Sequence, residues 1–420
     1  MATPRLDNAP TNDRPPDTGE APAGRQSLAL LEGVKIVAFT TFLVGPAAVQ
    51  YLADMGADVV KIEEPHRGPH ERHWSGADTR LNGESLLFLM SSRNIRSAGL
   101  NLKHPGGQGA AAALCREADV VVSNFRPGVM ERLGLGYEAL REDNPGLIYA
   151  TASGYGAKSP YRHLPGQDLL VQSISGLPSI TGPAGPPVAA GGVVVDQHAA
   201  TLLALGIAGA LYARSRTGQG QELEVTMVQS ALDLHAEALA CYLNGATLQR
   251  PRQGLATTYH EAPYGFYEVS DGYVALSISP MEKISAALGD PPELAPWLDP
   301  ALAFSRRQEI YDALAPLLTD FTREQLVRQL REHDVWCAPV NSFDEALEDP
   351  VVRDSGAIAT FEHPDAGQVR VVGHPIAYGS GVATVRRVPP RLGEHTREAL
   401  AEVGYSAEQI DEMAAEGVIR

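Results

Sequence analysis

The stretch GVKIVAFTTFLVGPAAVQYLADMGADVVKIEEP (residues 33–65) decides the predicted fold. Its two ends are short runs rich in β-branched residues, which is typical of buried strands. The segment between them has helical spacing, with Pro46 near its start and Gly56 just after its end. A strand, a helix and a second strand in this order predict two parallel neighbours in one sheet.

The same alternation continues to about residue 160. Strands are expected at 96–103, 119–125 and 146–156, and helices at 106–118 and 128–143. This pattern predicts an open α/β sheet of Rossmann type. The glycine fingerprint GxGxxG does not follow the first strand, which argues against a dinucleotide-dependent oxidoreductase.

The second half of the chain has a different character. A long apolar helix is expected from Asp196 to Thr217, followed by a strand at 221–227 and a helix at 228–245. After that point, two hairpins and several helices indicate a smaller α+β region. The hairpins are expected at 262–279 and 359–373, and the helices at 307–318, 322–334, 343–352, 396–404 and 406–417.

Composition limits the classes of partner. The chain has 420 residues, 44% of them hydrophobic, and a formal net charge of −17, so we expect no nucleic-acid partner. Residues 1–26 are rich in Pro and Asp and predict a disordered tail without features of a signal peptide. The apolar run at 200–213 is shorter than a membrane span, so we expect no membrane partner. The three cysteines show no metal-binding spacing, which favours reduced thiols and a cytoplasmic protein.

Several stretches together resemble the family III CoA-transferases, which include formyl-CoA transferase, carnitine CoA-transferase and the related α-methylacyl-CoA racemase. The most specific is NFRPG at residue 124, followed in order by RLGLGYEAL at 132 and NPGLIYA at 144. The first quoted stretch, ARSRTGQGQELEVTM at 213 and PPRLGEHTREALAEVGYSAEQIDEMAAEGVI at 389 also fit. The resemblance therefore covers nearly the whole chain from Leu31 onward.

This resemblance implies a domain organisation that spacing alone does not give. A Rossmann-like large domain would combine residues 27–225 with a C-terminal segment at 339–420. A linker helix and a smaller domain would occupy residues 226–338. Two such chains would interlock as an obligate homodimer.

The resemblance also implies a catalytic pair. Asp196 takes the place of the family nucleophile, and Asp168 takes the place of a second acid. Without the resemblance, an Asp before an apolar helix is most often an N-cap. The two roles are compatible, and we expect the helix N-terminus to lower the pKa of Asp196.

The implied reaction moves coenzyme A from an acyl-CoA to a free carboxylic acid through aspartyl anhydride and aspartyl-CoA intermediates. Coenzyme A is then a substrate, and we expect neither a permanently bound cofactor nor a metal. The family's glycine-rich loop is missing here, and Leu43 stands where formyl-CoA transferase has Gln. Both departures argue against simple exchange between formyl-CoA and oxalate.

Further residues carry over from the family by position. The residues expected to bind CoA are Leu43, Val44, Leu100, Asn101, Leu102, Lys103, Asn124, Phe125, Arg126 and Arg132. The substrate pocket is expected to include Trp74, with His260 and Glu261 near the place of the missing glycine loop. Each also has a structural interpretation: Arg132 as a solvated helix residue, Trp74 as a core residue, and His260 and Glu261 as surface-loop residues.

Two alternatives within the family stay open. A racemase would use Asp168 with a His to remove and return an α-proton. That His belongs after RLGLG, where this chain has YEALRED and no histidine. A non-catalytic acyl-CoA-binding homologue is the other alternative, and the presence of both acids argues against it.

Overall fold

The computed structural model describes residues 26–420. The tail predicted at the N-terminus therefore lies outside the described residues, apart from Gln26. The carbonyl of Gln26 accepts a hydrogen bond from the Val382 amide at 3.0 Å. The described chain thus begins in contact with a segment near its other end.

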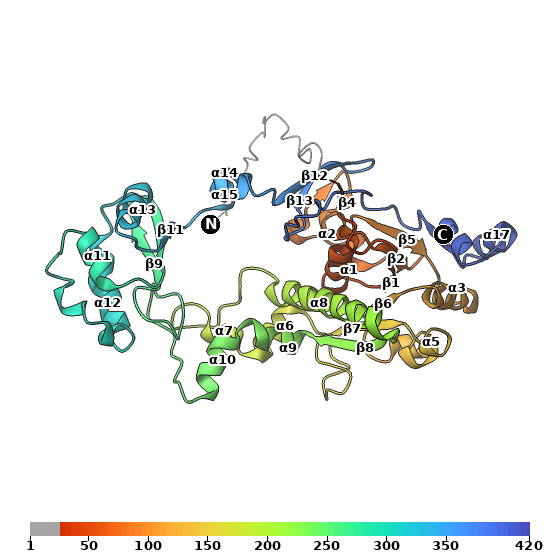
Figure 1. Ribbon diagram of the computed structural model, residues 1–420, viewed down its shortest axis with the longest axis horizontal. Coiled ribbons are helices and arrows are strands. Elements are labelled where there is room, and N and C mark those ends of the chain that lie inside the picture. The colour runs from red at the N-terminus through yellow and green to blue at the C-terminus, as the bar shows by residue number, and fades with distance from the viewer. Residues whose placement is uncertain (1–25) are drawn as a thin grey trace, which may run out of the picture.

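A six-stranded parallel sheet forms the centre of the larger half of the molecule, as the repeated strand–helix pattern predicted (Figure 1). Its strand order is β5-β2-β1-β6-β7-β8. The chain therefore builds outward from β1 in one direction and then returns to continue from β1 in the other. The strands are β1 (Lys35–Phe39), β2 (Asp58–Glu63), β5 (Ile95–Gly99), β6 (Val120–Ser123), β7 (Ile148–Ser153) and β8 (Gln221–Thr226).

Helices cover both faces of this sheet, which explains why its strands are almost continuously apolar. On one face, α1 (Val44–Asp54) and α8 (Val194–Thr217) pack together over the strands. The opposite face buries side chains from α3 (Pro105–Arg116), α5 (Tyr137–Asp143), α16 (Thr396–Glu402) and α17 (Ala407–Ala415).

The C-terminal segment returns to the edge strand β5. The His395 amide donates to the Ser97 carbonyl at 2.9 Å, and Leu100 forms a β-bridge with Ile419. The hairpin of β12 (Ile358–His363) and β13 (Gly367–Val372) packs on α2 (Leu86–Ser91). A small hairpin of β3 (Arg80–Leu81) and β4 (Glu84–Ser85) precedes α2. Residues beyond 357 therefore belong spatially with the first half of the chain.

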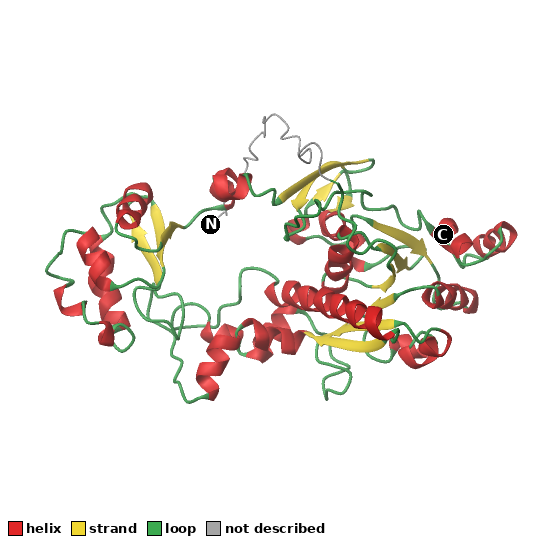
Figure 2. Cartoon of the chain, in the orientation of Figure 1, coloured by secondary structure: helices red, strands yellow, loops and turns green. Residues whose placement is uncertain are grey.

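A second unit has a core of its own, built from residues between Leu255 and Val335. Its sheet is antiparallel and contains β9 (Gly265–Val269), β10 (Gly272–Leu276) and β11 (Cys337–Pro339) (Figure 2). The helices packed on this sheet are α11 (Met281–Ala287), α12 (Arg307–Leu314) and α13 (Arg323–Glu332). Helix α13 begins with a capping box formed by Thr322 and Gln325.

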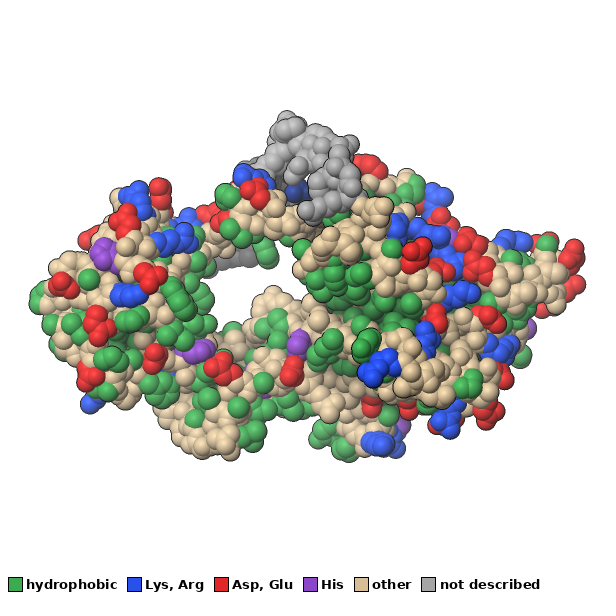
Figure 3. Space-filling model, viewed as in Figure 1, with side chains coloured by type: hydrophobic (Ala, Val, Ile, Leu, Met, Phe, Trp, Pro, Cys, Tyr) green, Lys and Arg blue, Asp and Glu red, His purple; other side chains and the backbone are tan. Residues whose placement is uncertain are grey.

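Two connections join the two halves. One runs through α9 (Met227–Leu234) and α10 (Ala236–Leu243), the other through α14 (Phe343–Glu348) and α15 (Pro350–Arg353). The single helix predicted at 228–245 is wrong, because the chain leaves helical geometry at His235, where ψ is +35°. The space-filling view shows an opening through the molecule between the connections (Figure 3).

Candidate active site

A cavity of about 1110 Å³ lies at the carboxyl ends of the central strands. Its walls include Thr41 to Val44 after β1, Asn124 to Pro127 after β6, and Ser153 to Gly156 after β7. Ligands of open parallel sheets bind outside the carboxyl ends of the strands, where the strand order reverses. In this sheet the order reverses between β1 and β6, so the cavity occupies the place that topology favours for a ligand.

The loop after β1 is fixed to the end of β6 by one side chain. The Asn124 Oδ1 atom accepts the Thr41 amide at 2.9 Å, and its Nδ2 atom donates to the Thr41 carbonyl at 2.7 Å. Gly45 leaves room for the Asn124 side chain, because a Cβ at this position would lie 3.1 Å from the Asn124 Cγ atom and 2.6 Å from the Thr40 Cγ2 atom. The first loop is therefore rigid where it meets the cavity.

A second loop, residues 155–165, closes on itself before it reaches Asp168. Gly154 and Gly166 cross so closely that a Cβ on Gly154 would lie 2.6 Å from the Gly166 Cα atom. Helix α6 (Asp168–Ser175) begins two residues later. The glycine crossing thus brings the first residue of α6 to the cavity wall.

Asp168 holds the first turn of α8. Its Oδ2 atom accepts the amides of Val195 at 2.8 Å and Asp196 at 3.0 Å, and its Oδ1 atom accepts from Gln172. The expectation that Asp196 caps this helix is wrong, because α8 begins at Val194 and has no side-chain cap of its own. The free amides of the first turn are instead bound by a carboxylate from another helix.

Asp196 is the third residue of α8 and also lines the cavity. Within residues 26–420, no hydrogen bond reaches its carboxylate, and the helix amides of Val195 and Asp196 donate to Asp168 instead. Burial, followed by repulsion from Asp168, raises the pKa of Asp196 to about 7. The expected lowering of this pKa is therefore wrong, and the reason is that the stabilising helix amides point to the other acid.

The cavity brings together many of the residues predicted from the sequence. Leu43, Val44, Trp74, Asn124, Phe125, Arg126, Asp168 and Asp196 all line it. Trp74 is half exposed, at 52%, so the core interpretation of this residue is wrong.

The other predicted residues lie outside the cavity wall. Leu100 is buried in the core, and Asn101, Leu102 and Lys103 follow it at the edge of the sheet. Arg132 is exposed on α4 (Val129–Arg132) and lies against the Gly128 backbone of the NFRPG turn. His260 stacks between the rings of Tyr259 and Tyr264, and Glu261 is next to it in the second unit. The role of each of these residues stays a prediction.

Sequence reasoning missed several residues of the wall. Phe42, His70, Tyr155 and Arg162 all line the cavity. Phe42 and Tyr155 follow predicted strands, so the rule that ligands bind at carboxyl strand ends would have found them. His70 and Arg162 come from irregular segments with no periodic signal. The described residues contain no cluster of three or more His, Cys, Asp or Glu side chains that could hold a metal ion.

The chain belongs to CoA-transferase family III: residues 31–396 match the description of this family. Among its relatives is an acyl-CoA transferase of Fusarium pseudograminearum, which is 33% identical over 94% of this chain and 89% of its own length. The mouse succinyl-CoA:glutarate CoA-transferase is 31% identical, covering 96% of this chain and 93% of the relative. The formyl-CoA:oxalate CoA-transferase of Escherichia coli is 32% identical, covering 91% of this chain and 98% of the relative.

Solved structures agree with this assignment. A CAIB/BAIF family protein from Brucella suis superposes with a TM-score of 0.76 at 28% identity, covering 90% of this chain and 100% of that protein. Rv3272 from Mycobacterium tuberculosis also superposes with a TM-score of 0.76 at 28% identity, covering 89% of this chain and 99% of that protein. The α/β fold of this chain is therefore shared with solved structures over most of its length.

Proposed function

We propose that this enzyme transfers coenzyme A from an acyl-CoA to a free carboxylic acid, with Asp196 as the nucleophile. The observation that carries this proposal is the position of Asp196 on the cavity wall, without the hydrogen bonds that hold Asp168. The family membership and the names of the relatives support the reaction class.

The proposed reaction has two halves. An Asp196 carboxylate oxygen attacks the thioester carbonyl, the carbon–sulfur bond breaks, and a mixed anhydride and CoA thiolate form. The thiolate then attacks the Asp196 acyl carbon, which releases the first acid and leaves an aspartyl-CoA thioester. The incoming acid reverses these steps. No step changes an oxidation state, so the reaction needs no oxidant or reductant. CoA is a substrate of the reaction.

The raised pKa of Asp196 suits this role at neutral pH. A carboxylate with a pKa of about 7 is more basic than an ordinary aspartate, yet a large fraction is still ionised near pH 7. Asp168 stays in place as the group that holds the helix turn. It raises the pKa of the nucleophile through its charge.

We assign the CoA moiety to the wall formed by the NFRPG turn. Asn124, Phe125 and Arg126 line the cavity there, and Arg132 lies next to Gly128 at the outer side of the same turn. Arg132 would then meet the phosphates, because guanidinium groups bind phosphate oxygens with paired hydrogen bonds. The adenine would lie toward Asn101 and Lys103.

The test is a mass-spectrometric screen of the purified protein with several acyl-CoA donors and a panel of free acids. We expect new CoA thioesters, and hydroxylamine added to enzyme and donor should leave a hydroxamate on the peptide containing Asp196. Failure to form a new thioester in every pair would reject the transferase proposal. Exchange of the α-proton with deuterated water in place of transfer would support the racemase alternative.

We further propose an interlocked homodimer. In it, the Rossmann-like large domain and the small domain of each chain would enclose part of the partner chain. The opening through the molecule supports it (Figure 3). Exposed apolar side chains on the helices that border the two halves also support it, since water would otherwise cover them: Leu205 is 64%, Tyr212 67% and Leu243 72% exposed. Light scattering that gives a stable monomer would reject the dimer.

Helix α8 has 24 residues and is long and apolar enough to cross a membrane by length and composition alone. Its residues Ala199, Leu203 and Ile207 are buried against the sheet, as in a core helix.

The proposed compartment is the cytoplasm. The three cysteines are free in the described structure, which is compatible with a reducing environment. Fractionation of the producing cells with an antibody against the protein would test this assignment, and recovery outside the cytoplasmic fraction would reject it.

A further inference from the structure

One wall of the cavity consists of three rings in a row, from Phe42, His70 and Trp74; we call it the aromatic wall. The ring centroids of Phe42 and His70 are 4.6 Å apart, and those of His70 and Trp74 are 6.1 Å apart and nearly parallel, at 24°. Phe42 is 45% exposed and Trp74 52%, and both rings line the cavity. Their flat faces are therefore available to a ligand.

The surroundings of the aromatic wall are apolar and carry no fixed charge. Leu86, Leu87 and Met90 of α2 line the cavity beside it. Among the lining residues from 70 to 90, His70 is the only titratable group. The cationic side chains of the cavity, Arg126 and Arg162, come from the loops after β6 and β7 instead. A second carboxylate placed at this wall would lose water without gaining a cationic partner.

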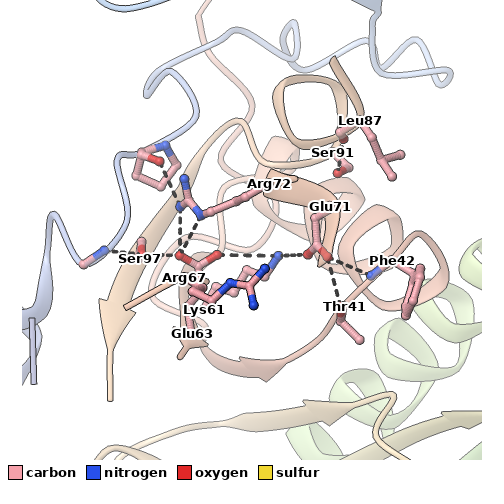
Figure 4. A network of polar contacts seen from close by, with 12 residues as sticks. Thr41, Phe42, Lys61, Glu63, Arg67, Glu71, Arg72, Leu87, Ser91 and Ser97 are labelled. Atoms are coloured by element: carbon pink, nitrogen blue, oxygen red, sulfur yellow. Dashed lines mark hydrogen bonds and ion pairs between the residues drawn. The ribbon is translucent and has the colours of Figure 1, made fainter. Parts of the chain in front are cut away.

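A buried carboxylate locks the aromatic wall in place (Figure 4). The turn His70–Arg72 directs His70 to the cavity and Glu71 into the core, where Glu71 is fully buried. The Glu71 Oε2 atom accepts the Phe42 amide at 2.9 Å and the Thr41 hydroxyl at 3.0 Å. One side chain therefore fixes two of the three ring-bearing segments relative to each other, including Phe42 in its left-handed conformation with a φ of 61°.

The network behind Glu71 is balanced in charge. Its Oε1 atom pairs with Lys61, which lies 3.8 Å from Glu63, and Glu63 in turn accepts from Arg72 at 2.8 Å. Two cations and two anions are thus enclosed together, and Ser97 supplies a further donor to Glu63 at 2.6 Å. Buried networks of this kind are rigid because breaking one pair leaves an unpaired charge. The wall is preorganised before any substrate binds.

From this geometry we propose that the enzyme's acyl group is a flat, aromatic acid whose ring stacks on Trp74. The proposal rests on the CoA transfer described above and adds the substrate class. A preformed stack of rings favours a planar aromatic body, since aromatic pairs gain energy beyond the burial of their area. Short dicarboxylic acids have no such surface and need a cation that this wall lacks.

Isotope exchange tests the substrate class without knowledge of the second acid. The enzyme is incubated with benzoyl-CoA and ¹³C-labelled benzoate, and separately with succinyl-CoA and ¹³C-labelled succinate, and label in each thioester is measured. We expect benzoyl exchange to be faster, and Trp74→Ala to lower its kcat/KM by roughly tenfold, a larger factor than the loss in succinyl exchange. Trp336→Ala is the matched control, because Trp336 is 63% exposed and lies outside the cavity lining.

Two results would overturn the proposal: faster succinyl exchange in the unaltered enzyme, or equal losses for both acids in Trp74→Ala. If Trp74→Ala does not fold, Trp74→Leu keeps the bulk and removes the flat face. The part of the tryptophan fluorescence quenching by free benzoate that disappears in Trp74→Leu then gives an independent measure of stacking, because the chain has three tryptophans. Absence of exchange with every acid would instead contradict the transferase function itself.

Discussion

Asp168 and Asp196 meet at the first turn of α8, but their surroundings are opposite. Asp168 is 7% exposed and its two oxygens accept three hydrogen bonds, two of them from helix amides. Asp196 borders the cavity with an unpaired carboxylate and a pKa raised to about 7. Two residues of the same type, side by side, thus differ in their partners: Asp168 holds the helix turn, and Asp196 has a raised pKa.

The comparison shows that the free amides at a helix N-terminus can bind only one of two neighbouring carboxylates, and here they bind Asp168. The amides of α8 donate to Asp168 and hold its carboxylate in place. The other acid bears both the cost of burial and the repulsion from its neighbour. The helix N-terminus therefore raises the pKa of Asp196 indirectly, by holding Asp168 next to it.

The largest expected effect separates the two acids by activity. Asp196→Asn should lower CoA transfer by on the order of 10³-fold or more, because an amide cannot form the anhydride. Initial rates of thioester formation measure this loss. Asp168→Asn is the matched control, because its amide oxygen can still accept from α8, and it should keep most of the activity. If Asp168→Asn is the inactive variant, the assignment of nucleophile must be exchanged between the two residues.

The next effect separates them by stability. Asp168→Ala removes the acceptor of two helix amides and should lower the free energy of unfolding by about 1–3 kcal/mol. Asp196→Ala removes an unpaired charge, so at pH 8 its free energy of unfolding should be equal to or above that of the unaltered protein. Denaturant titrations with both variants give the two values. A larger loss in Asp196→Ala would restore Asp196 as the cap.

The smallest effect concerns pH. Because the folded pKa of Asp196 is raised to about 7, the ionised nucleophile and kcat/KM should increase as pH rises through 7. Replacing the Asp168 charge in Asp168→Asn should lower this pKa and move the rising limb to lower pH by about one unit or less, since burial is the larger cause. A profile recorded from pH 5 to 9 tests the shift, and an unmoved limb would show that the two charges are not coupled.

The sequence predicted the parallel sheet because local patterns of apolar residues mark each strand and each helix of that region. Each strand from β1 to β8 in this sheet alternates with a helix of matching pattern, and Pro46 and Gly56 mark the bounds of the first helix. The family resemblance then placed Asp168, Asp196, Asn124 and Trp74 near one another, and all four line one cavity.

What the sequence could not predict depends on contacts between distant segments. The acceptor for the α8 amides lies 28 residues earlier in the chain, and no local pattern distinguishes it from an ordinary cap. The break at His235 interrupts a segment whose sequence contains neither Pro nor Gly between Met227 and Asn244, so no local signal marks it. Glu71 stands in the stretch PHERHW, whose spacing gives no sign that its middle residue is buried beneath a cavity wall.

The composition of the cavity wall has a consequence for side reactions. Acyl-CoA thioesters and anhydrides acylate amines and thiols, so an enzyme that forms them is at risk of modifying itself. No lysine or cysteine is among the described residues that line the cavity, and the chain has only five lysines. Lys61, which lies behind the aromatic wall, is fully buried and paired with Glu71. The described wall of the cavity therefore exposes neither a lysine amine nor a cysteine thiol to the intermediates that we propose.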